Sequence, residues 1–247
     1  MAITHKSTFG FCRKCNCEHS LGPSDRSQEL AEELISKLES SGRLDYDSVK
    51  PDPKFSTDYL FGPARGQMFG VLVCENSAGE EVAFKAFSCQ YNSYWLIDGW
   101  VPPLLDLETY NRIVPEADVE IKRLSKLMDS LAKDSVEYRE LKEKRKQISQ
   151  KLMKDIHDLY IFHNFSGQSV SMYEAFAVDR GIPTGAGDCC APKLLNHAAK
   201  HNLKPLGISE FYYGKENKSA TRKHKHFYSS CMEKCYPLLG FMLCGVD

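Results

Sequence analysis

The 247-residue sequence has no long apolar run and no large excess of charge of one sign. No segment approaches the roughly 18 apolar residues that a membrane-spanning helix requires. The first ten residues, "MAITHKSTFG", lack the basic stretch followed by an apolar core that a secretory signal would have. The formal net charge is −1, so attraction to a polyanion must come from local clusters of charge. We expect a globular cytoplasmic protein with no membrane attachment.

The sequence also lacks an internal repeat, a glycine-rich nucleotide-binding loop and a nucleophile elbow, which removes several common enzyme classes from consideration. It does contain ten cysteines. In a reducing compartment, cysteines in this number are better interpreted as buried thiols or metal ligands than as disulfides.

Apolar periodicity predicts the main elements of the fold. Leu30, Leu34 and Leu38 recur at helical spacing, which predicts a helix that is capped by Asp25 and ends at Gly42. Further along the chain, two apolar runs flank the turn sequence "NSAGE" between residues 68 and 90, and this pattern predicts a β-hairpin. A short aromatic strand is expected at "ISEFYYG", residues 208–214.

Residues 116–162 have a different character, with apolar residues at heptad spacing and many charges between them. Asp134 and Glu137 match a capping box, so we expect two antiparallel helices, although a single bent helix is an alternative. The predicted class is α/β (α+β), with a small mixed sheet, a β-hairpin, packed helices and this inserted helical hairpin. The predicted domains are a cysteine-rich segment (1–24), one α/β domain (25–115 and 163–247) and the insertion (116–162).

The stretch "TGAGDCCAPKLL" places two glycines and two cysteines at the start of a predicted helix, with Asp188 as the expected N-cap. The positive potential of a helix N-terminus favours a thiolate. A second cysteine pair follows a later loop. If the two pairs meet, they form a tetrahedral sulfur site for zinc, and the alternative is that they are buried as small apolar side chains. The predicted metal ligands are Cys189, Cys190, Cys231 and Cys235.

A cysteine at a helix start, then a strand, then two cysteines is also the order of ligands in zinc-dependent nucleobase deaminases. Those enzymes carry a glutamate two residues after the first ligand, where this sequence has Ala191 or Pro192. Glu210, in the following strand, is a possible substitute. A deaminase-like scaffold is therefore an alternative for the fold.

A third group of soft ligands lies near the start of the sequence, in "FCRKCNCEH". Cys12, Cys15, Cys17 and His19 are too close in sequence for one zinc ion to take all four without strain. A structural metal site and a loosely packed chain end are both open interpretations.

Basic residues interleaved with aromatic ones occur in the loop "TRKHKHFY". This combination suits phosphate contacts together with base stacking. The predicted RNA-binding residues are Arg222, Lys223, His224, Lys225, His226, Phe227 and Tyr228. A second basic stretch lies between Arg139 and Lys154, where a solvated helix face is the simpler interpretation.

From about residue 55 onward, the sequence resembles the N-terminal region of long RluA-type RNA pseudouridine synthases. The resemblance rests on "RGQMFGVLVCE", "WVPPLLD", "GIPTGAGDCCAPKLLNHAAKHNLKPLGISEFYYG" and "HFYSSCMEKCYPLLGFML". The His-Arg-Leu-Asp type motif of the family's catalytic domain is not found in the sequence. The resemblance therefore implies an RNA-binding accessory region, acting on rRNA or tRNA beside a C-terminal pseudouridine synthase domain, whether this sequence is a fragment or a stand-alone relative.

Three functions follow as expectations. The first is an accessory region that holds RNA and is not catalytic by itself. The second is a zinc-binding, deaminase-like domain. The third is a structural or partner-binding domain that uses the helical hairpin. Bound zinc, RNA affinity and base deamination distinguish the three.

Overall fold

The computed structural model describes residues 7–246, which divide into two compact units. Unit 1 comprises residues 7–104, 162–170 and 174–246, and unit 2 comprises Leu105–Ile161 and Ser171–Tyr173. The expected α/β class is confirmed: the described residues form six α-helices and three small sheets. Within residues 7–246, no helix is both long and apolar enough to cross a membrane.

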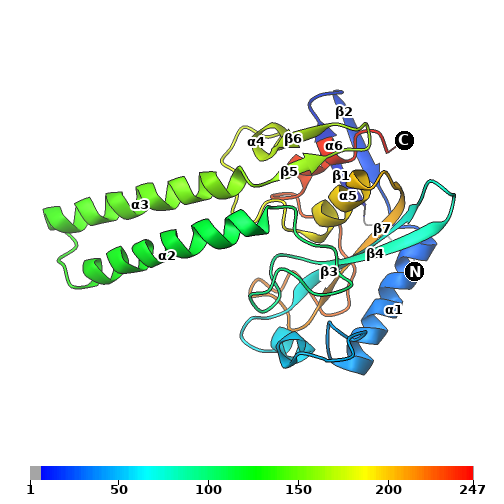
Figure 1. Ribbon diagram of the computed structural model, residues 1–247, viewed down its shortest axis with the longest axis horizontal. Coiled ribbons are helices and arrows are strands. Elements are labelled where there is room, and N and C mark those ends of the chain that lie inside the picture. Colours follow the sequence, from blue (N-terminus) through cyan, green and yellow to red (C-terminus); the bar gives the residue numbers. More distant parts are fainter. Residues whose placement is uncertain (1–6, 247) are drawn as a thin grey trace. The chain divides into compact units, whose positions relative to one another are not determined.

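A three-stranded antiparallel sheet forms the centre of unit 1, in the order β4-β3-β7 (Figure 1). Its strands are β3 (Gln67–Glu75), β4 (Glu81–Phe87) and β7 (Lys204–Tyr213). The predicted hairpin is confirmed as β3 and β4, and the predicted aromatic strand as β7. The prediction of a mixed sheet is wrong, because both neighbours of β3 run antiparallel to it.

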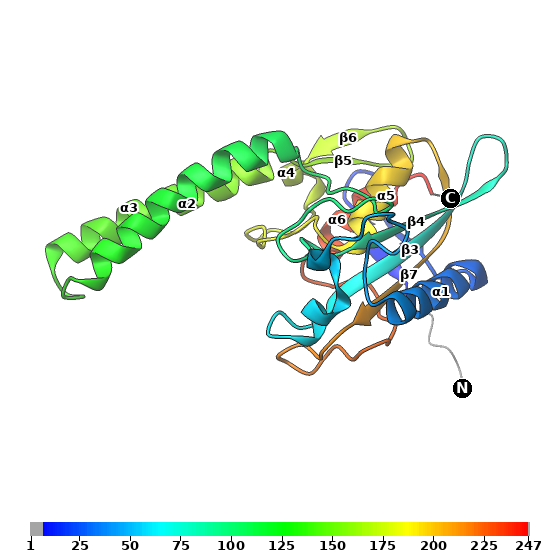
Figure 2. The same ribbon diagram turned by 60° about the horizontal axis from the view of Figure 1, so that its bottom comes forward.

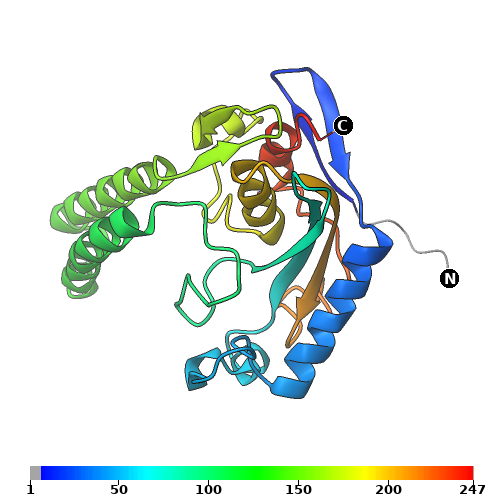
Figure 3. The same ribbon diagram turned by 45° about the vertical axis from the view of Figure 1, so that its right-hand side comes forward.

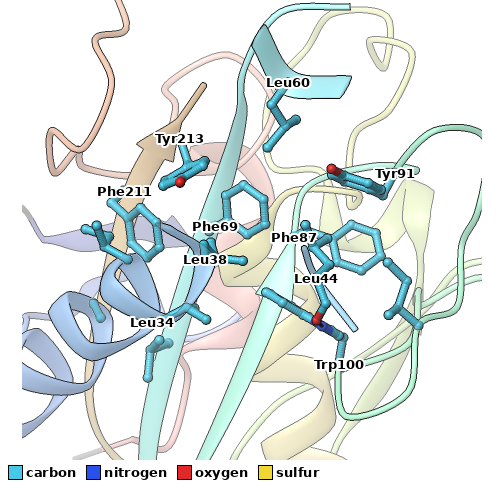
Figure 4. Close-up of a cluster of buried hydrophobic side chains, with 14 residues drawn as sticks. Leu34, Leu38, Leu44, Leu60, Phe69, Phe87, Tyr91, Trp100, Phe211 and Tyr213 are labelled. Carbon is cyan, nitrogen blue, oxygen red and sulfur yellow. Dashed lines mark hydrogen bonds between the residues drawn. The ribbon is translucent and has the colours of Figure 1, made fainter. Parts of the chain in front are cut away.

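Two helices cover opposite faces of this sheet, α1 (Asp25–Ser41) and α5 (Cys190–Lys200) (Figure 3). Side chains alternate between the faces of a strand. Phe69 and Phe211 accordingly lie in the apolar core on the α1 side, together with Leu38 (Figure 4). The opposite face of β3 has Gly70, where an added Cβ would lie 2.9 Å from the Cβ of Cys190. The sheet therefore packs its aromatic face against α1. Its other face packs against the start of α5, where the helix carries its cysteines.

Helix α1 begins and ends near the predicted residues, but its cap differs. Ser24, not Asp25, is the N-cap, and it forms a reciprocal pair of hydrogen bonds with Ser27. Ser27 also bonds to Ser209 of β7 at 2.9 Å, so the cap is joined to the sheet. Gly42 is the C-cap in the left-handed conformation, as predicted (φ +66°).

A second layer of unit 1 is built from both ends of the sequence. Strands β1 (Thr8–Cys12) and β2 (Cys17–Leu21) form an antiparallel hairpin that packs on α6 (Tyr236–Met242). The contact is close because glycines face each other: a Cβ on Gly10 would lie 2.4 Å from the backbone nitrogen of Gly240. Besides the long helices of unit 2, the described residues also form η1 (Pro53–Phe55), η2 (Thr57–Phe61), β5 (Ile161–His163), β6 (Ser169–Ser171) and α4 (Met172–Ala175).

Unit 2 is an antiparallel pair of long helices, α2 (Leu107–Asp129) and α3 (Val136–His157), visible in Figure 2. Two helices were predicted, but α2 begins at Leu107, ahead of residue 116. Asp106 caps it, and Pro115 lies inside the helix. The predicted capping box at Asp134 is wrong, since Ser135 is the N-cap of α3 and accepts a hydrogen bond from the Tyr138 N–H.

Candidate metal centre and its basic rim

Cys189 is the first thiol of the candidate site, and the start of α5 positions it. It is the N-cap of the helix and has extended backbone, with no hydrogen bond from its side chain to the cap. The predicted N-cap, Asp188, lies one residue earlier. Gly185 and Gly187 precede it with φ of +73° and +90°, the left-handed conformations expected of this glycine turn. Because its thiol is not used as a cap, Cys189 can contribute its sulfur to another group.

Cys231 and Cys235 come from the turn that leads into α6. The Tyr236 N–H donates to the carbonyl of Cys231 at 3.0 Å, which folds the turn back on itself and brings the two sulfurs to 3.4 Å. The sulfur of Cys189 joins them, and all three lie within 4.8 Å of one another. The structure therefore brings together three of the four predicted ligands from two separate elements. We name Cys189, Cys231 and Cys235 the three-thiol group.

Cys190 lies outside the three-thiol group. It is fully buried between α5 and the sheet, and its thiol donates to the carbonyl of Met68 at 3.2 Å. Burial raises its pKa well above the usual value for a thiol, so it behaves as a small buried side chain. The adjacent residues Cys189 and Cys190 therefore have different environments.

The sulfurs of the three-thiol group are electrostatically coupled. Hydrogen bonds from Cys189 and Cys235 lower the pKa of Cys231 to about 2. The same contacts raise the pKa of Cys189 and of Cys235 well above the usual range. The mutual hydrogen bonds thus favour a thiolate at Cys231, and the thiolate is the form in which a cysteine binds a soft cation.

Glu210 of β7 lies beside this group, on the face of the sheet that packs against α5. Its carboxylate accepts a hydrogen bond from the Ala191 N–H at 3.2 Å and another from the Ser230 hydroxyl at 2.8 Å. Burial raises the pKa of Glu210 to about 7, against the opposing effect of these two donors. A carboxyl group that gains and loses a proton near neutral pH is therefore fixed between the backbone next to Cys189 and the side chain next to Cys231.

A pocket of about 700 Å³ opens next to Cys231. Arg222, Tyr228 and Lys234 line it together with Cys231 and Ser230. The guanidinium of Arg222 lies over the Tyr228 ring, 4.3 Å from its centroid. The pocket thus combines two cations and an aromatic face with one edge of the three-thiol group.

The other predicted RNA-binding residues differ in their roles. Lys223 and His226 are exposed. His224 accepts a hydrogen bond from the Gly214 N–H at 3.0 Å and packs edge-on against Tyr213. Phe227 packs against Phe211 of the core, and Lys225 forms an ion pair with Glu39. These three residues hold the loop on the domain, whereas Arg222, Lys223, His226 and Tyr228 remain oriented to solvent or to the pocket.

The basic stretch of unit 2 is partly neutralised within its own helices. Glu120 pairs with Arg123 at 2.7 Å and with Lys144 at 3.4 Å, and Arg123 lowers the pKa of Glu120 to about 2. Lys151 pairs with Asp155 at 2.5 Å. These pairs favour a solvated helix face for this stretch.

Two relevant residues, Ser230 and Lys234, were not predicted. Ser230 positions Glu210, and Lys234 lines the pocket. The feature of the sequence that could have identified them is their position beside Cys231 and Cys235 in "SSCMEKC". A search of known proteins returned no matching family model, no curated relative and no matching solved structure. A proposal of function therefore rests on the geometry of these residues and on the resemblance expected from the sequence.

Proposed function

We propose that unit 1 is an RNA-binding accessory region of the RluA-type pseudouridine synthase kind, with a zinc ion held by Cys189, Cys231 and Cys235. The observation that carries this proposal is the shared pocket: Arg222 and Tyr228, predicted RNA contacts, line the same cavity as Cys231, a predicted metal ligand. The partner is rRNA or tRNA, and a C-terminal pseudouridine synthase domain would perform the isomerisation.

The donor set fits zinc. Sulfur ligands at about 2.3 Å from a tetrahedral ion lie about 3.8 Å from one another. The three-thiol group meets this requirement with small adjustments, since its sulfurs all lie within 4.8 Å and one pair lies at 3.4 Å. Three protein ligands leave a fourth position for water, and a bound zinc ion lowers the pKa of such a water.

The pocket fits a segment of single-stranded RNA. Arg222 and Lys234 supply charge for a phosphate, and the Tyr228 ring supplies a face for a base. The Arg222 guanidinium already stacks on that ring, so a base would insert beside it or displace it. Lys223 and His226 extend the positive surface outside the pocket.

The test is RNA binding across a salt series. For Arg222→Ala and Lys234→Ala, we expect weaker binding to a single-stranded oligonucleotide and a salt slope smaller by about one for each phosphate that the variant no longer neutralises. For Tyr228→Leu, we expect weaker binding with the slope unchanged, because the substitution removes stacking and leaves the ionic interactions in place. Lys50→Ala, in an exposed loop far along the sequence, is the control. Wild-type protein with no affinity at low salt would refute the proposal.

A second candidate, deaminase-type hydrolysis, is favoured by one observation. Deaminases place their proton-transferring glutamate two residues after the first ligand. Here that residue is Ala191, and its N–H donates to the Glu210 carboxylate at 3.2 Å. A carboxyl group from β7 thus contacts the backbone of the residue at which a deaminase carries its glutamate. On this proposal, the scaffold is deaminase-like in its order of α5, β7 and the turn before α6.

This second candidate has its own experiment. Zinc-loaded protein is incubated with cytidine-containing and adenosine-containing single-stranded RNA, and released ammonia and the product bases are measured. We expect Glu210→Gln to abolish turnover while zinc content is retained, and Glu233→Gln, an exposed residue at the same pocket, to leave turnover intact. Wild-type protein without turnover would remove this candidate and leave the RNA-binding proposal unaffected.

A further inference from the structure

A second group of soft ligands lies in unit 1, and it shares no residue with the three-thiol group. Cys12, Cys15, His19 and Cys244 place three sulfurs and one imidazole nitrogen within 4.8 Å of one another. The Cys15 sulfur lies 3.0 Å from Nε2 of His19. Only the first three of these residues are near one another in sequence. The fourth, Cys244, follows helix α6.

The fold explains how residues from both ends of the sequence meet. Strands β1 and β2 pair with Cys12 opposite Cys17 and with Gly10 opposite His19. Paired residues share a face of the hairpin. The close approach of Gly10 to Gly240 shows that this face is turned toward α6. His19 therefore projects on the α6 side, where the helix ends and Cys244 follows.

The tight turn of the hairpin brings Cys15 into the same group. Residues 13–16 connect the strands, and Asn16 adopts a left-handed conformation with φ of +57°. Asparagine tolerates this conformation, and the left-handed residue reverses the chain direction at the end of the turn. Cys17 has a different role, because its thiol donates to the backbone carbonyl of Cys15 at 3.4 Å. Of the four candidate ligands in "FCRKCNCEH", Cys12, Cys15 and His19 therefore belong to this group. Cys244 takes the place of Cys17.

We propose that Cys12, Cys15, His19 and Cys244 bind one zinc ion that fastens the β1–β2 hairpin to the residue after α6. Three thiolates and one imidazole form a full tetrahedral set for zinc, with no position for water or substrate. The ligand atoms lie close to the separations that bonds of about 2.0–2.3 Å require. The role is structural: the ion closes a loop from Cys12 to Cys244, and it holds the hairpin against α6, where Gly10 and Gly240 allow a close backbone approach.

The ligand set differs from the one that a sequence pattern suggests, and this difference makes the proposal testable. Protein prepared with zinc in the presence of a reductant is analysed for metal by mass spectrometry. We expect two zinc ions per wild-type chain, one for Cys244→Ser, and two for the control Cys17→Ser. For Cys231→Ser we expect loss of the other ion, as two independent sites require.

Further measurements address the case in which a variant fails to fold. His19→Ala is a second route to the same loss, and circular dichroism verifies that each variant retains its secondary structure. Cobalt(II) replacing zinc reports the ligands directly, because the charge-transfer absorption of wild type falls by one thiolate contribution in Cys15→Ser and is unchanged in Cys17→Ser. Equal zinc content in wild type and Cys244→Ser, equal losses in Cys17→Ser and Cys244→Ser, or a disulfide within the group under reducing conditions would each overturn the proposal.

Discussion

The two sulfur groups of unit 1 differ in what surrounds them. The three-thiol group has a buried carboxyl group beside it and a pocket of about 700 Å³ at its edge. The group at Cys12 and Cys244 has four candidate ligands, and the turn of a hairpin carries one of them at the surface. An incomplete ligand set next to a pocket suits a site that acts on a bound molecule, whereas a complete set suits a site that holds the fold together.

Removal of zinc is expected to have the largest effect. At a free zinc concentration about 1,000 times the Kd, one site contributes about 4 kcal/mol to the free energy of unfolding. Chemical denaturation in zinc buffer and in chelator measures this difference. Cys231→Ser and Cys244→Ser should each lose part of the response, and Cys244→Ser should leave RNA binding intact. A denaturation midpoint that does not depend on zinc would contradict both sites.

The next largest effect concerns the pH dependence of stability at Glu210. Burial raises its pKa from 4.5 to about 7, so between these values the folded state keeps a proton that the unfolded state has lost. The contribution of Glu210 to the free energy of unfolding therefore falls as pH rises through this range, by about 3 kcal/mol in total, and does not change further above it. The variant Glu210→Gln carries no titrating proton and should lack this slope.

The measurement is the difference in the free energy of unfolding between wild type and Glu210→Gln at several pH values, on protein kept free of metal by a chelator, because a zinc ion on the neighbouring thiols would itself shift the pKa of Glu210. A difference that rises with pH would have the wrong sign and would indicate an ionised carboxylate in the folded protein. No such effect is expected for Glu233→Gln, since Glu233 is exposed.

A smaller effect is expected from Gly10→Ala. The new methyl group would lie 2.4 Å from the Gly240 nitrogen, so β1 must move away from α6 at a cost of about 1–3 kcal/mol. This movement separates Cys12 and His19 from Cys244, and we expect loss of one zinc ion with the three-thiol group unaffected. Gly181→Ala is the matched control, because no heavy atom lies within 4 Å of the added methyl group. Zinc content and thermal unfolding measure both effects.

The smallest effect is expected from Cys17→Ser. The side chain is exposed and makes only a weak bond to the Cys15 carbonyl, so stability should change by no more than about 0.5 kcal/mol. Zinc content should remain that of wild type. A clear loss of zinc would show that Cys17, and not Cys244, completes the second site.

Local patterns predicted much of the fold. The spacing of Leu30, Leu34 and Leu38, the stop at Gly42 and the turn between β3 and β4 are properties of neighbouring residues, and all are confirmed. The errors at the caps are also local. Ser24 was preferred to Asp25 because its hydroxyl pairs with Ser27, which in turn bonds to Ser209 of a distant strand. A cap that takes part in tertiary contacts cannot be selected from helix propensity alone.

The candidate sites were harder to predict because their ligands come from separate elements. The sequence placed Cys189 and Cys190 together, but only the sheet determines that one faces Cys231 and the other faces the Met68 carbonyl. Cys244 carried no signal as a ligand, since the hairpin that it meets lies at the other end of the sequence. The place of Glu210 likewise became clear only from the structure, because the alternation of side chains along β7 decides whether Glu210 faces α5.

That alternation has a consequence for the evolution and engineering of this protein. In β7, Glu210 and Phe211 are neighbours that serve opposite faces of the sheet, one beside the sulfurs and the other stacked on Phe69. Insertion or deletion of a single residue ahead of them would exchange the two faces, placing a carboxylate among aromatic rings and a phenyl group against the thiols. Length changes in this strand should therefore be tolerated only in pairs.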